Sequence, residues 1–317
     1  MNLKNSFKLM VANAKTVFAD MIFRLIIFVL CAGVASTFVI PFVKDIVFAD
    51  ATRTLFDELR GVIGAFFTNS AEMAVKGDLL LDAVKGFNDM LADKISDITG
   101  VAIGLAVILV VYSILFGLAN YASGDVVNKY MSSLTRCRYT NAILSNFGKA
   151  FLYQLIEGLC FFVAETLIIA FCFGVFVLTA EYIYIFAPML AILLVILLNT
   201  LFTVFFSNFL PAITAGGQGV FSGFKTSFVY GAKHFKTLFA QYLIVNLILI
   251  YVNVSFTLFT FGVGFIFSLP VSCVFVSCVK LVNYYSFSGK KYYVDYDDIV
   301  NPAKQNGEEI FFDDVNI

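Results

Sequence analysis

Six long apolar runs dominate this chain and constrain its fold more than any other feature. Each is long enough to cross a bilayer as a helix, which takes about 20 residues. Only 14% of the 317 residues are charged, whereas soluble domains carry about 25%. The sequence therefore predicts an all-α, polytopic integral membrane protein with six transmembrane helices. They lie near Ile22–Val43, Val101–Ser123, Ala150–Thr179, Tyr182–Ser207, Thr237–Phe259 and Gly262–Tyr284.

Lysine and arginine residues predict how these spans are oriented. They gather before the first span, after the second and after the fourth, which places them on one side of a six-span protein. Because basic loops stay on the cytoplasmic side, we expect a multi-pass protein of the cell membrane with both termini cytoplasmic. The basic residues are Lys4, Lys8, Lys15 and Arg24, then Lys129, Arg136, Arg138 and Lys149, then Lys225, Lys233 and Lys236.

The segment 44–100 falls on the opposite side of the membrane and is too long to be a turn. It has six basic and ten acidic residues, and its apolar residues recur at helical spacing. This pattern predicts a helical extracytoplasmic insertion of two amphipathic helices joined around Lys76–Gly77–Asp78. The insertion could fold onto its own membrane domain, lie on the outer leaflet or bind a partner protein.

The two ends of the chain flank a six-helix membrane domain predicted over residues 22–286. Residues 1–21 read as an amphipathic N-terminal interfacial helix, with Leu3, Phe7 and Met10 on its apolar face. A cleaved signal peptide is the alternative, because Ala49–Asp50–Ala51 is similar to a cleavage site. Residues 287–317 read as an acidic cytoplasmic tail with a short ordered start, which either solubilises the protein or docks a partner.

The stretch GGQGVFSGFKTS, residues 216–227, has the residue types of a phosphate-binding loop but not the spacing. A P-loop has a glycine, four intervening residues and then Gly-Lys-Ser/Thr. Here Phe224 separates Gly223 from Lys225. We instead expect Pro211 to end the fourth span, the glycines to form a turn, and an interfacial helix to begin at Val220. Its basic residues are headgroup-facing candidates, namely Lys225, Lys233, His234 and Lys236.

A longer pattern around this stretch resembles a known family. Pro-Ala-Ile, a glycine turn, Phe-Lys-x-Ser-Phe and Lys-His-Phe precede the fifth span. This arrangement resembles bacterial six-span proteins related to the membrane domain of glycerophosphodiester phosphodiesterases. The resemblance covers about thirty residues, and it implies a membrane module without implying hydrolysis. The matching residues are Pro211, Ala212, Ile213, Gly219, Phe224, Lys225, Ser227, Lys233 and Phe235.

Four polar residues are expected inside the bilayer. Glu157 and Glu165 lie on one stripe of the third span, and Asn246 and Asn253 lie at matching depths in the fifth. We therefore predict that these two spans are neighbours and that Glu165 faces Asn253. The four groups either form a proton path or fix helix packing through hydrogen bonds.

Other chemistry finds little support in the sequence. The only histidine is His234, and the six cysteines include no C-x-x-C pair, so we expect no metal site, no cofactor and no catalytic residue. A net charge of −1 gives no reason to expect a nucleic-acid partner.

The expected function is a non-enzymatic integral membrane module that organises or assists a partner or a lipid-handling process. Its surroundings are the lipid bilayer, and a protein partner would bind through residues 44–100 or the C-terminal tail. The alternative is a proton-coupled transporter or carrier that uses Glu157 and Glu165.

Overall fold

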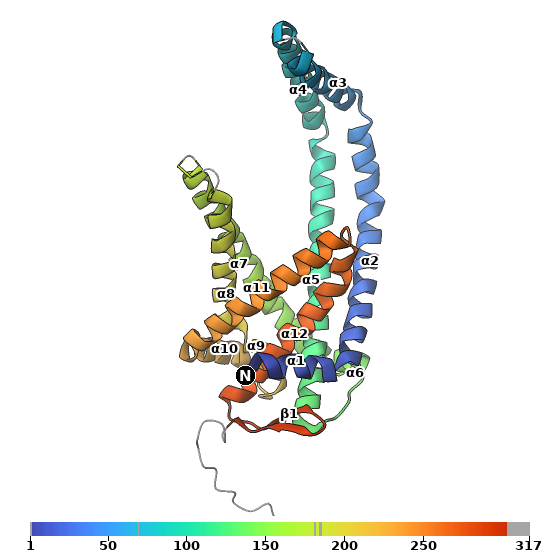
Figure 1. The fold of residues 1–317 in the computed structure, drawn as a ribbon. Helices are drawn as coiled ribbons and strands as arrows, with labels where there is room; N and C mark the ends of the chain where they lie inside the picture. Colours follow the sequence, from blue (N-terminus) through green and yellow to red (C-terminus); the bar gives the residue numbers. More distant parts are fainter. Residues whose placement is uncertain (1, 69, 181, 184–185, 303–317) are drawn as a thin grey trace, which may run out of the picture. The chain divides into compact units, whose positions relative to one another are not determined.

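The protein is described from a computed structural model that covers residues 2–68, 70–180, 182–183 and 186–302. Its helices and strands follow one another along the chain as shown in Figure 1. The helices are α1 (Asn2–Ala12), α2 (Ala14–Val47), α3 (Asp50–Thr68), α4 (Ser70–Asp93), α5 (Ile95–Ser133), α6 (Tyr139–Ser145), α7 (Phe147–Ala180), α8 (Ala187–Phe206), α9 (Phe209–Thr214), α10 (Val220–Lys233), α11 (Phe235–Phe259) and α12 (Val263–Phe287). The strands are β1 (Tyr292–Asp295) and β2 (Asp298–Val300).

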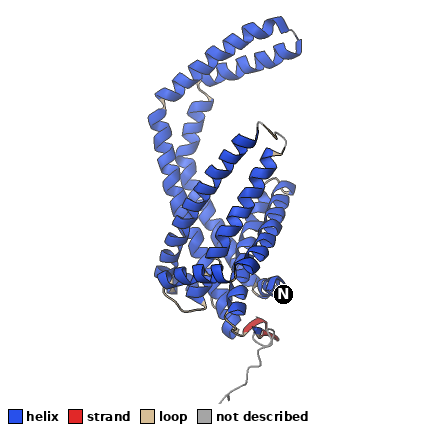
Figure 2. Cartoon of the chain, turned by 90° about the vertical axis from the view of Figure 1, so that its left-hand side faces the viewer, coloured by secondary structure: helices blue, strands red, loops and turns tan. Residues whose placement is uncertain are grey.

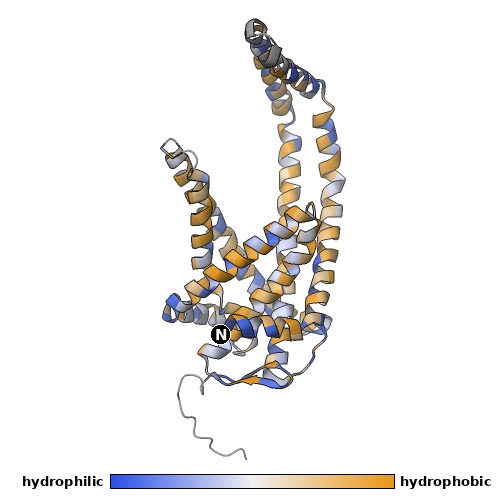
Figure 3. Cartoon of the chain, in the orientation of Figure 1, coloured by the Kyte–Doolittle hydropathy of each residue, from blue (hydrophilic) through white to orange (hydrophobic). Residues whose placement is uncertain are grey.

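The predicted fold class is confirmed. Six helices of the described chain are long and apolar enough to cross a membrane, so this is an all-α, multi-pass membrane protein. Figure 3 shows apolar residues along these helices and more hydrophilic ones in α3 and α10. Half of the most apolar stretch of α12 is buried, against 6–17% in the other five spans. α12 is therefore the span that the protein itself encloses most.

The chain divides into two compact units. The larger comprises Met1–Ile26 with Ser113–Ile317, and the smaller comprises Ile27–Tyr112. In the larger unit, α8 packs against both α7 and α11, and α11 packs against α12. Since α8 lies between α7 and α11, the prediction that the third and fifth spans are neighbours is wrong.

Helices α3 and α4 form an antiparallel hairpin in the smaller unit (Figure 2). The two amphipathic helices are as predicted, but the break between them is not, because Lys76–Gly77–Asp78 lies inside α4. A glycine inside a helix costs only about 1 kcal/mol relative to alanine, so Gly77 is tolerated there. Lys76 also reaches across to α3, where its Nζ lies 3.8 Å from a carboxylate oxygen of Glu58.

The N-terminal segment forms two helices rather than one helix over residues 1–21. α1 ends at Ala12, and α2 starts at Ala14 and continues into the first span. The buried residues of α1 are Asn5, Ser6 and Leu9, whereas Phe7 is 57% exposed. Of the predicted apolar face, Leu3 and Met10 pack against the protein core, and Phe7 points outward.

The glycine-rich stretch forms the predicted turn, and α10 begins at Val220 as predicted. Gly217 has φ +65°, a left-handed conformation that favours glycine. Pro211, however, does not end the fourth span: α8 ends at Phe206, and Pro211 lies in the first turn of α9. At that position proline removes no helical hydrogen bond.

A two-stranded β-hairpin follows α12, where the sequence predicted only a short ordered start to an acidic tail. Strands β1 and β2 pair antiparallel, and the side chains of Tyr292, Val294 and Val300 join a core that includes Leu9 of α1 and Met131 of α5. The alternation of apolar residues along β1 explains how one face of so short a strand is buried. The part of the predicted tail after residue 302 lies outside the described residues.

Candidate functional site

A buried ion pair on α2 has the densest set of polar contacts in the larger unit. Asp20 is fully buried and Arg24 is 5% exposed. Because they lie one helical turn apart, Arg24 Nε donates to Asp20 Oδ2 at 2.6 Å. The same carboxylate accepts hydrogen bonds from Ser123 Oγ of α5 at 2.7 Å and from the Tyr139 hydroxyl of α6 at 2.8 Å. One acidic side chain thereby joins three helices.

Further groups on α5 and α6 surround this pair. Arg24 Nη2 donates to Asn120 Oδ1 at 2.7 Å, and the guanidinium lies 3.9 Å from the centroid of the Phe116 ring, a cation–π arrangement. Burial, and then the Asp20 carboxylate, raise the pKa of Tyr139, so its hydroxyl stays protonated as a donor. Arg24 Nη1 is buried without a hydrogen-bond partner in the described structure.

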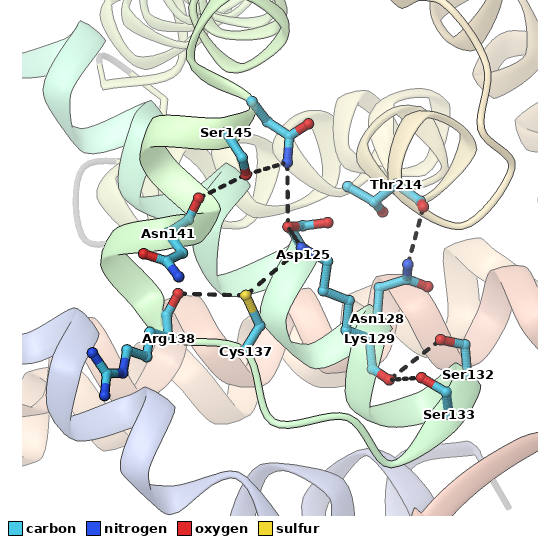
Figure 4. Close-up of polar contacts among 11 residues, drawn as sticks. Asp125, Asn128, Lys129, Ser132, Ser133, Cys137, Arg138, Asn141, Ser145 and Thr214 are labelled. Atoms are coloured by element: carbon cyan, nitrogen blue, oxygen red, sulfur yellow. Dashed lines mark hydrogen bonds and ion pairs between the residues drawn. The ribbon is translucent and has the colours of Figure 1, made fainter.

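A second acid–base pair lies near the end of α5 (Figure 4). Lys129 Nζ donates to Asp125 Oδ2 at 2.7 Å and contacts Cys137 Sγ at 3.7 Å. Asn146 Nδ2 also donates to Asp125, at 3.4 Å. The Cys137 thiol in turn lies 3.5 Å from the carbonyl oxygen of Arg138. These contacts tie the loop between α5 and α6 to the end of α5.

Glu157 has a partner that the sequence analysis did not predict. Lys280 Nζ of α12 lies 3.6 Å from Glu157 Oε1, and the two side chains are 16% and 15% exposed. The sixth span was predicted to end at Tyr284, and α12 continues to Phe287. Lys280 therefore lies about two turns inside the helix, within reach of Glu157.

Glu165 and the two asparagines do not form the predicted constellation. Glu165 is partly exposed and makes no hydrogen bond or ion pair with any described residue. Asn246 Nδ2 donates to Thr200 Oγ1 of α8 at 3.0 Å. Asn253 Nδ2 donates to Ser272 Oγ of α12 at 3.0 Å. The asparagines join α11 to its two neighbouring spans, and α8 separates them from α7.

The headgroup-facing candidates differ in their surroundings. Lys225, Lys233 and Lys236 are exposed, whereas the His234 ring is partly buried and stacks on Phe287, with centroids 4.1 Å apart and planes at 11°. Burial, and then Lys233, lower the pKa of His234. Its imidazole therefore acts as a neutral packing group as well as a surface residue.

The Asp20–Arg24 pair was not predicted as a site, because Arg24 was interpreted as one of the basic residues that orient the first span. Their spacing of four residues inside an apolar helix was the available signal, since such residues lie on one helix face. Asp125 and Lys129 show the same spacing and were missed for the same reason. The residues of α5 and α6 that these pairs contact cannot be predicted from spacing within one helix.

The arrangement as a whole holds helices together. Two intrahelical acid–base pairs and one interhelical pair balance their charges, and their hydrogen bonds cross between spans. No protein-family model, curated protein or solved structure matches this chain. The resemblance to the membrane domain of glycerophosphodiester phosphodiesterases therefore stays a prediction.

Proposed function

We propose that this protein is a non-enzymatic module of the cell membrane, with both termini cytoplasmic, that organises a protein partner through its extracytoplasmic hairpin α3–α4. The observation that carries the proposal is a row of large apolar side chains that the hairpin leaves exposed. Phe56, Leu59 and Ile63 follow one another at helical spacing on α3 and are 62%, 40% and 52% exposed. Val75 and Leu79 on α4 are 63% and 44% exposed.

The interior of the hairpin explains why this row is free to bind something else. Ala65 and Ala83 are buried, and Leu55, Val62 and Leu80 are half-buried. The two helices thus already have a closed interface of small and medium side chains. Apolar rows that remain exposed after such packing are typical of interaction surfaces.

The charge of the hairpin favours a protein over a lipid surface as the occupant. Residues 50–93 contain eight acidic and four basic side chains. Anionic membranes attract basic segments, so an acidic hairpin is repelled by them. A protein with an apolar patch and a basic rim complements both the exposed row and the acids beside it.

The polar groups within the spans give less support to the proton-coupled transporter. A relay needs ionisable groups that can exchange protons along a path. Glu157 has Lys280 as a partner, and Glu165 forms no ion pair with a described residue. Asn246 and Asn253 bond to hydroxyl groups. These contacts favour a packing role, which suits a module that carries a docking surface.

Site-specific photo-crosslinking in cells tests the docking surface. A photoreactive phenylalanine analogue at Phe56 should form one discrete protein adduct, and the same analogue at the half-buried Leu55 should form much less. Adding Ile63→Asp should abolish the Phe56 adduct, and raised salt in isolated membranes should weaken it because the partner is basic. Adducts to lipid alone, to a second copy of this chain, or unchanged by Ile63→Asp would contradict the proposal.

Cysteine labelling tests the orientation separately. In a variant whose own cysteines are replaced, a cysteine at the exposed Leu81 of α4 should react with a membrane-impermeant maleimide added outside intact cells. A cysteine at Gln218, in the turn before α10, should react only after the cells are opened. The reverse pattern would overturn the cytoplasmic placement of both termini.

A further inference from the structure

A cavity of about 310 Å³ lies where α1 joins α2, beside the loop between α5 and α6. Its walls come from Asn13, Lys15 and Thr16 on one side and from Val126, Arg136 and Cys137 on the other. All of these residues belong to the larger unit. The volume lies at the lower end of the range for small-molecule sites.

Two polar side chains in the wall are more than nine-tenths buried. Asn13 is 7% exposed and Thr16 is 8% exposed. Asn13 Nδ2 donates to the Leu9 carbonyl at 3.0 Å. The Thr16 hydroxyl makes no hydrogen bond with the described part of the chain. Because Thr16 lines the cavity, its hydroxyl can donate a hydrogen bond to a molecule that enters.

The charged side chains around the cavity all have one sign. Lys15 and Arg136 line it, and neither forms an ion pair or a side-chain hydrogen bond with a described residue. No acidic side chain of the described residues lines the cavity. The nearest acid in sequence, Asp125, is already bonded to Lys129, as Figure 4 shows. Two unneutralised cations around a confined space favour an anion.

We propose that this cavity binds a phosphate group. Arginine offers a planar fork that matches phosphate oxygens, lysine adds a point charge, and the threonine hydroxyl is an uncharged donor. The phosphate belongs either to a lipid headgroup of the adjacent leaflet or to a free phosphate or phosphomonoester. The site goes beyond the proposed docking function and does not depend on it, because the hairpin α3–α4 contributes no residue.

Cys137 provides a reporter within the site. Its thiol is partly buried in the cavity wall, so a bound phosphate should slow its alkylation by a maleimide. The full chain is reconstituted in phosphatidylcholine nanodiscs, and alkylation of each cysteine is followed by mass spectrometry. The probes are inorganic phosphate, sodium chloride at matched ionic strength, and phosphatidic acid mixed into the phosphatidylcholine.

Variants separate a built site from general surface charge. The half-protecting phosphate concentration should rise about tenfold or more in Arg136→Gln, because a charged hydrogen bond is lost. Lys15→Gln and Thr16→Val should weaken protection in the same direction. Arg138→Gln is the matched control, because Arg138 is exposed on the same loop but does not line the cavity. Circular dichroism checks that each variant keeps its helices.

Each outcome decides the proposal. Protection by inorganic phosphate in phosphatidylcholine discs identifies a free phosphate as a ligand, and protection only with phosphatidic acid identifies a lipid headgroup. Both outcomes require that Arg136→Gln weakens the effect and Arg138→Gln does not. No protection by either probe, equal protection by sodium chloride, or equal loss in both arginine variants would overturn the phosphate site. None of these results would alter the crosslinking expected from Phe56.

Discussion

Replacing Asp20 by asparagine should destabilise this protein more than any change to a surface charge. The Asp20 carboxylate is fully buried and accepts hydrogen bonds from Arg24, Ser123 and Tyr139. Asparagine keeps the size of the side chain but presents an NH₂ group where one of these donors now finds an oxygen. It also leaves the buried guanidinium without a counter-charge.

The magnitude follows from the burial of both partners. Breaking a buried ion pair by removing one member costs about 3–5 kcal/mol, and Arg24 is only 5% exposed. The exposed pair between Lys8 and Asp298 is the control. Its N···O distance is 2.8 Å, but its side chains are 48% and 43% exposed, so Asp298→Asn should cost about 0–1 kcal/mol.

Unfolding in mixed micelles with sodium dodecyl sulfate, followed by circular dichroism, measures these differences. The double variant Asp20→Asn with Arg24→Gln should cost less than the sum of the single variants, by about 1 kcal/mol or more, because the groups share one network. An Asp20→Asn protein as stable as the wild type would refute the reasoning, as would strictly additive single and double variants.

Three further measurements follow from the packing. Gly231→Leu should strongly destabilise the protein in the same assay, because a Cβ at this position of α10 would lie 3.1 Å from the α8 backbone; a wild-type unfolding curve would count against that close approach. Asn246→Leu should cost about 0.6–2 kcal/mol through loss of its bond to Thr200, and Thr200→Val should cost a similar amount; a loss in only one of them would argue against a shared bond. The folded-state pKa of His234 is lowered below its usual 6.5. The native state therefore binds fewer protons than the unfolded state near this pH, and the free energy of unfolding should fall as the pH drops below 6.5. His234→Phe keeps the stacking on Phe287 and should lack this pH dependence, whereas equal pH profiles for both proteins would disprove the assignment.

Long-range packing could not be predicted where the sequence offered two equally good faces or partners. Glu165 and Asn253 have matching depths in their spans, which suggested contact, but depth does not specify which helix lies beside which. α8 packs against both α7 and α11, and its Thr200 accepts a hydrogen bond from Asn246 of α11. Lys280 lies inside the predicted sixth span, but nothing in that span or in the third indicated that it meets Glu157.

Local features of the backbone were easier to predict from the sequence than contacts between helices. The glycine turn before α10 was predicted, and Gly217 has the positive φ value that such a turn requires. The β-hairpin was missed because its strands have only four and three residues. A pattern that short has no periodicity strong enough to separate it from a charged tail.

The sequence by itself determined that this is an integral membrane protein, how many helices can span the membrane, and that residues 44–100 form amphipathic helices. These follow from hydropathy and periodicity, which act on each segment alone. The tertiary structure alone decided which polar groups meet: Asp20 with Tyr139 of another helix, Glu157 with Lys280, and Lys15 with Arg136 around one cavity. The physical reason is that the free-energy cost of placing a polar group in lipid depends on the segment that carries it, so the sequence of that segment is enough to estimate it. The partner that offsets this cost is set by how separate helices pack, and that packing arises only when the whole chain folds.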